Sequence, residues 1–172
     1  MSHESLSATS RVGRENQLFN DKGARLVAGC VVLNSTYDQV LLISSSAKKN
    51  KWVLPKGGIE TDEAEDYSKT AIRETWEEAG VTGELIGQLP VVEDLRPPKE
   101  WGKLTNDKIL NNPPRSEFHF YEMLVEKFHD IYPESKERKR KWFSFQEAID
   151  ELNGNKRPEL VEILKNSRIK KK

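Results

Sequence analysis

The most constraining feature of this chain is a run of three glutamates, Glu74, Glu77 and Glu78, in a segment that predicts a helix over residues 66–79. At about 100° per residue, these glutamates lie on the side of the helix opposite Trp76 and Ala79. One face would pack against a core, and the other would carry carboxylates. Like charges at i, i+4 destabilise a helix by about 0.2–0.5 kcal/mol per pair, so their retention suggests a cation at this face.

The three carboxylates have two interpretations. Hard divalent cations such as Mg²⁺ bind carboxylate oxygens, often one or two of them together with substrate phosphates. The alternative is a solvated acidic face on which Arg73 and Glu77 form an ordinary i, i+4 ion pair. The pair Gly57-Gly58, which forms a glycine-rich loop before the helix, favours the metal site.

The same segment resembles the signature of the Nudix hydrolases, G-x5-E-x7-R-E-U-x-E-E-x-G-U, in which U is a bulky apolar residue. The residues at its fixed positions are Gly57, Glu63, Arg73, Glu74, Glu77, Glu78, Gly80 and Val81. Nine residues instead of seven separate Glu63 from Arg73, so we expect a longer loop into the helix. Thr75 also replaces the first apolar residue of the pattern, a mild change on the core side.

The chain as a whole predicts one α/β domain, because 172 residues can bury a substantial core. We expect a flexible N-terminal segment over residues 1–20, a Nudix hydrolase domain over 21–168 and a basic tail over 169–172. Hydrophobic patterning predicts strands at 26–33, 39–44, 52–55, 85–93, 116–125 and 141–145, and further helices at 145–152 and 158–166. This order favours a mixed sheet with helices on its faces. The Nudix resemblance implies the same, an α/β/α sandwich whose signature forms a loop, a helix and a loop.

The composition limits the cellular compartments and the partners that we expect for this chain. No apolar run reaches the roughly 18 residues that a membrane span needs, and residues 1–5 lack the apolar region of a secretory signal. The single cysteine, Cys30, lies in an apolar run and is expected to be a buried small residue in a reducing compartment. We expect a cytoplasmic monomer, with the nucleus as a second location, and no membrane partner.

The charges are segregated along the chain although the net charge is zero. Residues 60–94 carry a net charge of −9, and residues 136–172 carry a net charge of +6. An acidic metal-binding pole beside a basic phosphate-binding pole would show this pattern, and so would an ordinary domain with a basic tail. Basic residues also gather in the predicted loops, where phosphate-binding groups are commonly placed.

Within the Nudix group, nearly the whole chain resembles the diphosphoinositol polyphosphate phosphohydrolases, a group that also cleaves diadenosine polyphosphates. The resemblance is strongest to the fungal form. The matching strings include Gly23-Ala24-Arg25-Leu26-Val27-Ala28-Gly29, Trp52-Val53-Leu54-Pro55-Lys56-Gly57-Gly58 and Lys156-Arg157-Pro158-Glu159-Leu160. The resemblance implies a basic bowl for inositol phosphates, formed by Arg25, Ser46, Lys48, Lys56, Arg96, Arg115, Arg138 and Arg157. It also implies that the Gly57 carbonyl, Glu74 and Glu78 hold the metal and that Glu77 accepts a proton.

These residues together predict hydrolysis of a phosphoanhydride by a metal-activated water. The expected metal is Mg²⁺ or Mn²⁺, with Zn²⁺ as a third candidate. The expected substrates are diphosphoinositol polyphosphates, diadenosine polyphosphates of the Ap5A and Ap6A type, and inorganic polyphosphate. Glu77 would take the proton of the water, basic side chains would offset phosphate charge, and Arg73 would orient a glutamate.

Two alternatives to this activity stay open. The first is an enzyme that removes mRNA caps with the same glutamates and binds RNA through the basic run at residues 136–141. The second is a non-catalytic module that binds inositol phosphates or nucleotides. The intact glutamates argue against the second alternative, because a binding module has no need of them.

Overall fold

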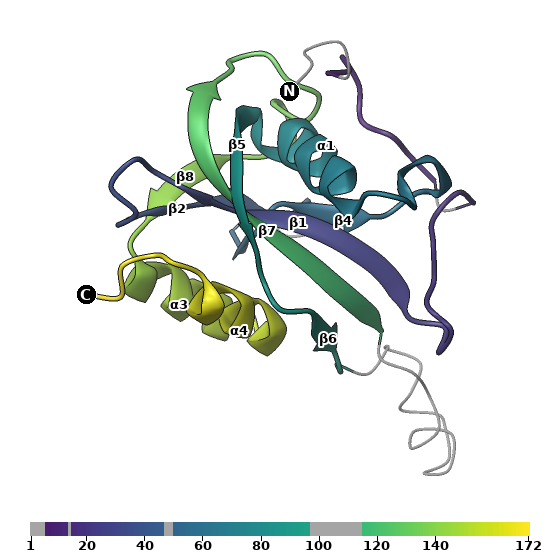
Figure 1. Cartoon of the computed structure of the whole chain (residues 1–172). Helices are drawn as coiled ribbons and strands as arrows, with labels where there is room; N and C mark the ends of the chain where they lie inside the picture. The colour runs from purple at the N-terminus through teal and green to yellow at the C-terminus, as the bar shows by residue number, and fades with distance from the viewer. Residues whose placement is uncertain (1–5, 14, 47–49, 97–114) are drawn as a thin grey trace.

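Among the residues that the computed structural model describes, 6–13, 15–46, 50–96 and 115–172, eight strands form one mixed sheet (Figure 1). The strands are β1 (Arg25–Leu33), β2 (Val40–Ser44), β3 (Trp52–Val53), β4 (Lys56–Gly58), β5 (Val81–Gln88), β6 (Val92–Asp94), β7 (Ser116–Phe128) and β8 (Arg140–Phe143). The helices are α1 (Tyr67–Ala79), α3 (Phe145–Gly154) and α4 (Pro158–Asn166), and a short 3₁₀ turn covers Thr61–Glu63.

The centre of the sheet is the parallel pair β1 and β7. Their register runs from Arg25 opposite Ser116 to Leu33 opposite Leu124. β2 and β4 pair antiparallel with β1, and β5 and β6 pair antiparallel with β7. All residues of β1 after the first are buried, as expected of a strand that is covered on both faces.

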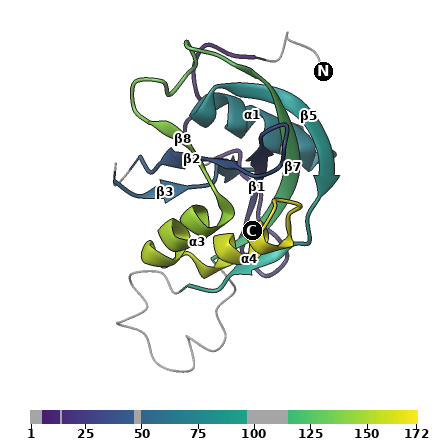
Figure 2. The same cartoon turned by 90° about the vertical axis from the view of Figure 1, so that its left-hand side faces the viewer.

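The helices cover opposite faces of this sheet, with α1 on one side and α3 and α4 on the other (Figures 1 and 2). α1 begins after Asp66, whose side chain accepts a hydrogen bond from the backbone of Ser68. It ends at Gly80, which has a φ of 65° and donates its N–H to the Trp76 carbonyl at 3.0 Å. The predicted α/β/α sandwich and the predicted helix before Gly80 are therefore confirmed.

The predicted strand over residues 85–93 is wrong in its extent, because the chain forms two strands there. β5 begins earlier, at Val81, and β6 follows after a break around Pro90. Proline has no N–H to donate to the neighbouring strand. The chain stays close to β7 through the break, where Leu89 donates its N–H to the Phe120 carbonyl at 2.9 Å.

The predicted strand over residues 52–55 ends earlier, at Val53, and a further strand, β4, was not predicted. The chain around Pro55 runs close against β1, where the Pro55 carbonyl accepts from the Cys30 N–H at 3.2 Å. A Cβ on Gly29 would lie 2.3 Å from that carbonyl oxygen, so glycine is required for this approach. β4 depends on this long-range pairing, which the local sequence around Pro55 does not reveal.

Two further expectations concern the membrane and the cysteine. Within the described residues, no helix combines the length and the apolar character that crossing a bilayer requires. Cys30 is fully buried, as predicted, and its burial raises the pKa of the thiol to about 12. Such a thiol stays protonated and acts as a small core side chain.

Candidate active site

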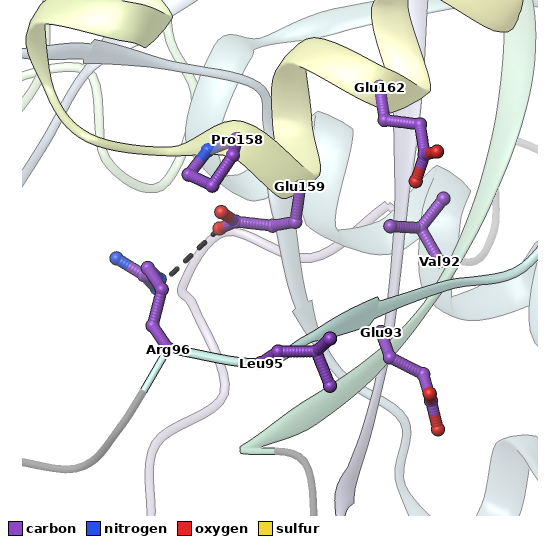
Figure 3. Close-up of a pocket in the computed structure, with 7 residues that line it drawn as sticks. All are labelled: Val92, Glu93, Leu95, Arg96, Pro158, Glu159 and Glu162. Carbon is purple, nitrogen blue, oxygen red and sulfur yellow. Dashed lines mark ion pairs between the residues drawn. The ribbon is translucent and has the colours of Figure 1, made fainter.

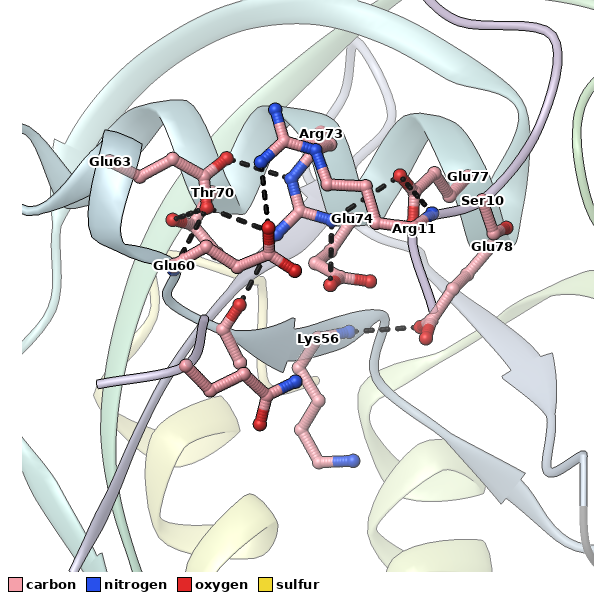
Figure 4. A network of polar contacts seen from close by, with 12 residues as sticks. Ser10, Arg11, Lys56, Glu60, Glu63, Thr70, Arg73, Glu74, Glu77 and Glu78 are labelled. Atoms are coloured by element: carbon pink, nitrogen blue, oxygen red, sulfur yellow. Dashed lines mark hydrogen bonds and ion pairs between the residues drawn. The ribbon is translucent and has the colours of Figure 1, made fainter. Parts of the chain in front are cut away.

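Arg73 lies at the centre of the signature segment and contacts three glutamates (Figure 4). Its Nε and Nη2 atoms donate to the Glu63 carboxylate at 2.7 and 3.0 Å. Its Nη1 atom lies 3.1 Å from Glu74 Oε2 and 3.3 Å from Glu77 Oε2. Nη2 also donates to the Gly58 carbonyl at 3.2 Å. Arg73 therefore fixes carboxylates and a glycine loop, as expected of a residue that orients a glutamate.

Glu63 reaches Arg73 despite the two extra residues between them. The 3₁₀ turn at Thr61–Glu63 brings its side chain back toward α1, where Oε1 also accepts from the Thr70 hydroxyl at 2.7 Å. Burial alone would raise the pKa of Glu63, but the hydrogen bonds from Arg73 and Thr70 outweigh it and hold the pKa below its usual value. The longer connection leaves the ion pair intact.

Glu74, Glu77 and Glu78, which we call the carboxylate cluster, are not a solvated face. Their exposed fractions are 9%, 1% and 9%. Burial raises the pKa of Glu78 to about 7. Burial, followed by the charge of Glu78, also raises the pKa of Glu74 well above its usual value. Carboxylates in this setting strongly favour a nearby cation.

Glu74 and Glu78 both contact the start of β4. The backbone N–H of Lys56 donates to Glu78 Oε1 at 3.0 Å. A Cβ on Gly57 would lie 2.0 Å from Glu74 Oε2, so the carboxylate occupies the space that any other residue would fill. Two carboxylates at one backbone turn, with the charge of Glu78 raising the pKa of Glu74 further after burial, fit a hard divalent cation.

The donor set at this place is small. Within the described part of the chain, no group of three or more histidine, cysteine, aspartate or glutamate side chains has the arrangement of a metal site. The predicted set has two carboxylates, Glu74 and Glu78, and one carbonyl, that of Gly57. Such a set suits Mg²⁺, which commonly binds one or two carboxylates and keeps water or substrate phosphate as its other ligands.

Four of the predicted phosphate-binding residues, Arg25, Lys56, Arg96 and Arg157, are linked to one another, and we call them the basic cluster. Burial, together with the charges of Arg157 and Arg25, lowers the pKa of Lys56 to about 8. Arg157 donates to Glu159 at 2.6 Å, and Arg96 lies 3.5 Å from the same carboxylate oxygen. The buried Glu159 carboxylate therefore links Arg157 and Arg96. Lys56 is close enough to Arg157 and Arg25 for their charges to lower its pKa.

The remaining predicted phosphate-binding residues are placed differently. Arg115 is exposed, and its carbonyl accepts from the N–H of Arg25 at 3.3 Å, which places it beside the basic cluster. Ser46 is exposed in the segment after β2. Arg138 lies at the carboxylate cluster instead. It pairs with Glu78 at 3.3 Å and donates to the Ser44 carbonyl at 3.0 Å. Lys48 lies outside the described residues.

A cavity of about 470 Å³ lies beside the basic cluster, between β6 and the start of α4 (Figure 3). Its apolar residues are Val92, Leu95 and Pro158, and its charged residues are Glu93, Arg96, Glu159 and Glu162. The Arg96–Glu159 ion pair forms part of its wall. The second carboxylate oxygen of Glu159 is buried and has no hydrogen-bond partner among the described residues.

Three residues at the carboxylate cluster were not predicted. Arg11 donates its backbone N–H to Glu77, Ser10 donates to Glu134, and Glu134 accepts from Arg138. Ser10 and Arg11 belong to a polar segment without helical or strand periodicity, so only their positions in space mark them as part of the site.

The site combines a glycine turn, a helix that carries Arg73 and three glutamates, and Glu63 held by Arg73. A comparison of the whole chain with known families agrees with this geometry. The NUDIX domain family model matches residues 23–165. The chain belongs to the NUDIX family. Nudix hydrolase 21, chloroplastic, from Arabidopsis thaliana is 38% identical over 154 residues, which cover 87% of this chain and 70% of that protein. Human diphosphoinositol polyphosphate phosphohydrolase 3-alpha is 31% identical over 145 residues, which cover 83% of this chain and 77% of that protein.

Solved Nudix structures share the fold. A NUDIX hydrolase from Nitrosomonas europaea aligns with a TM-score of 0.62 at 16% identity, over 83% of this chain and 87% of that chain. The crystal structure of a C. elegans Ap4A hydrolase binary complex aligns with a TM-score of 0.59 at 19% identity, over 83% of this chain and 94% of that chain. The resemblance to Nudix hydrolases that the signature predicted, and the resemblance to diphosphoinositol polyphosphate phosphohydrolases along most of the chain, are confirmed by the family match and the curated relatives.

Proposed function

We propose that this Nudix hydrolase cleaves a phosphoanhydride bond in a polyphosphorylated small molecule, with Mg²⁺ or Mn²⁺ bound by Glu74, Glu78 and the Gly57 carbonyl. The observation that carries the proposal is the burial of two mutually repelling carboxylates against the backbone of Lys56 and Gly57. Divalent metals are the usual cofactors of Nudix enzymes, which supports the choice of ion. A divalent cation held there would polarise phosphate oxygens and activate a water at neutral pH.

Glu77 is our candidate for the group that takes the proton of the water. Burial raises its pKa above the usual value, although Arg73 acts against that shift. A carboxylate whose pKa is raised toward neutrality is a better general base. Its position is fixed by Arg73 Nη1 at 3.3 Å and by the N–H of Arg11 at 3.3 Å.

Lys56 connects the two halves of the site, because its backbone N–H contacts Glu78 while its ammonium belongs to the basic cluster (Figure 4). A substrate with several phosphates could therefore extend from the carboxylate cluster to Arg25 and Arg157. Cationic side chains in such a setting stabilise negative charge on the substrate and in the transition state.

Diphosphoinositol polyphosphates are our first choice of substrate, and diadenosine polyphosphates and inorganic polyphosphate follow. The relative named as a human diphosphoinositol polyphosphate phosphohydrolase, at 31% identity over 83% of this chain, supports the order. All three substrate types present several phosphates in a row, which the basic cluster would accommodate.

The test is cleavage of a diphosphoinositol pentakisphosphate, diadenosine hexaphosphate and polyphosphate in parallel, with Mg²⁺, Mn²⁺ or Zn²⁺. We expect Glu74→Gln and Glu78→Gln each to lower kcat by about 10²-fold or more, because each removes several kcal/mol of metal-dependent stabilisation. Glu65→Gln, an exposed neighbour in the signature, is the matched control and should retain activity.

Three other outcomes would contradict the proposal. Near-normal activity of both glutamine variants at saturating metal would rule out these ligands. Cleavage of capped RNA without cleavage of the three small substrates would indicate a decapping enzyme. Tight binding of the substrates without turnover under any metal would indicate a binding module.

A further inference from the structure

Residues 6–13, which we call the N-terminal strap, run past the side of α1 that carries the carboxylate cluster (Figures 1 and 4). The indole Nε1 of Trp76 donates to the Ser7 carbonyl at 2.8 Å. Farther along the chain, Thr61 donates its N–H to the Asn16 carbonyl at 2.8 Å, and Leu18 donates to the Ile59 carbonyl at 2.8 Å. The strap is therefore anchored before and after its contacts with the site.

Arg11 makes the direct contact with the proposed base. Its backbone N–H donates to Glu77 Oε2 at 3.3 Å. Its guanidinium Nη1 pairs with Glu60 Oε1 at 2.8 Å and with Asp62 Oδ1 at 2.9 Å. These two ion pairs fasten Arg11 to the loop that leads into α1, so its N–H is held in front of the Glu77 carboxylate.

Ser10 reaches Glu78 through a chain of contacts. Its hydroxyl donates to Glu134 Oε2 at 2.5 Å, and Glu134 Oε1 accepts from Arg138 Nε at 2.6 Å. Arg138 Nη2 in turn lies 3.3 Å from Glu78 Oε2. Glu134 also donates its backbone N–H to the Glu77 carbonyl at 3.0 Å. Two adjacent strap residues are thus connected to two adjacent glutamates of the cluster by separate routes.

We propose that the N-terminal strap is a positioning element of the active site, in which Arg11 orients Glu77 and Ser10 orients Glu78 through Glu134 and Arg138. The proposal rests on the proposed function for the roles of the two glutamates. It assigns no contact with substrate to the strap, so substrate binding should depend on it far less than turnover does. Outer-shell partners of metal ligands commonly change metal affinity or activity by 10- to 100-fold when removed.

A purely structural role for the strap makes a different prediction. The Arg11 side chain is 40% exposed and that of Asp62 is 64% exposed, so their ion pair contributes little to stability. A strap that only held the fold together would affect activity in proportion to the loss of stability. A positioning strap would affect turnover without such a loss.

The test uses the full chain with the double substitution Ser10→Ala and Arg11→Ala. We expect kcat for the best substrate to fall by about tenfold or more, while KM stays within about twofold, because displacing a catalytic group slightly is enough to slow the reaction. Thr9→Ala is the matched control, since Thr9 is an exposed neighbour in the same strap. The conservative pair Ser10→Thr and Arg11→Lys should restore most of kcat.

A second measurement does not depend on turnover. Titration of Mn²⁺ followed by electron paramagnetic resonance should show an affinity about threefold or more weaker in the double-alanine variant than in Thr9→Ala. Unchanged kcat and unchanged Mn²⁺ affinity would overturn the proposal. A fall in kcat that only parallels a fall in Tm would overturn it as well. If the natural protein cleaves none of the substrates, the proposed function fails, and the Mn²⁺ titration still decides whether the strap orders the cluster.

Discussion

At the residue scale, the contact between Gly57 and Glu74 separates an effect on the site from an effect on the fold. A Cβ at position 57 would lie 2.0 Å from Glu74 Oε2, whereas a Cβ at Gly154 would meet nothing within 4 Å. The atom in the way is the end of a flexible side chain, so the carboxylate would move while the backbone stays in place. The cost of Gly57→Ala should therefore fall on Glu74.

We accordingly expect Gly57→Ala to lower kcat by about tenfold to a hundredfold, since a carboxylate displaced by about 1 Å no longer holds the metal correctly. Its Tm should change by no more than a few degrees. Gly154→Ala, in a helix, should keep full activity and be slightly more stable. Steady-state kinetics and thermal unfolding of both variants are the measurement, and a fully active Gly57→Ala would show that Glu74 needs no such space.

At the scale of elements, the Glu63–Arg73 ion pair joins the 3₁₀ turn at Thr61–Glu63 to α1. Glu63 is buried and Arg73 is largely covered, with side-chain exposed fractions of 5% and 10%. Removing one partner of a buried pair leaves an uncompensated charge and commonly costs about 3–5 kcal/mol. Arg73 retains Glu74, Glu77 and the Gly58 carbonyl as partners, so the loss here should be near the lower end.

The prediction is that Glu63→Gln lowers the free energy of unfolding by about 3 kcal/mol. Urea unfolding measures it, and Glu65→Gln is the control because that side chain is exposed two residues away. Equal midpoints for the two variants would mean that the turn is held to α1 by other contacts. The result also tests whether the two extra residues between Glu63 and Arg73 weaken this ion pair.

The same scale shows what the sequence can predict. Helices α1 and α4 were predicted within a residue because their ends are marked locally, by Asp66 and Gly80 for α1 and by Pro158 for α4. β4 was missed because it depends on pairing with β1, far away in the chain. The break before β6 has a local signal, Pro90, which the hydrophobic pattern overrode in the prediction. Local patterns specify elements that are stabilised locally, and leave open those that a distant partner creates.

The candidate site divides in the same way. The positions of Glu74, Glu77 and Glu78 on one face of α1 could be predicted, because the geometry of a helix places residues at this spacing on one face. Arg138 was expected among the phosphate-binding residues, and in the structure it pairs with Glu78 and Glu134. Nothing in the basic run at residues 136–141 marks Arg138 as the side chain that reaches Glu78, or Arg140 as the one that donates to the Ala79 carbonyl at the end of α1.

At the scale of the whole molecule, the carboxylate cluster should couple stability to pH and to metal. Burial raises the pKa of Glu78 from 4.5 to about 7, and the pKa of Glu74 is raised in the same direction. Between pH 4.5 and about pH 7, Glu78 of the metal-free native chain holds a proton that the unfolded chain releases. The free energy of unfolding should then fall as pH rises, by at most about 1.4 kcal/mol per pH unit for one proton.

Metal-free protein should therefore be more stable at pH 5.5 than at pH 7.5. The ion pair of Glu63 works in the opposite direction, since its lowered pKa gives stability that is lost only below its usual value of 4.5, outside this window. Glu78→Gln is the matched control, because it removes one of the two proton sites and should make the slope between pH 5.5 and 7.5 shallower, while Glu74 keeps the rest. Urea midpoints in the presence of a chelator measure both proteins.

Bound divalent metal should oppose this fall of the free energy of unfolding with rising pH. A cation competes with the protons for Glu74 and Glu78, so it binds more tightly as pH rises. Mg²⁺ or Mn²⁺ at about a hundred times its Kd should add about 3 kcal/mol to the free energy of unfolding at pH 7.5, and less at pH 5.5. In Glu78→Gln this gain should largely disappear. A metal effect of the same size in both proteins, at both pH values, would place the cation away from the carboxylate cluster and contradict the assignment of its ligands.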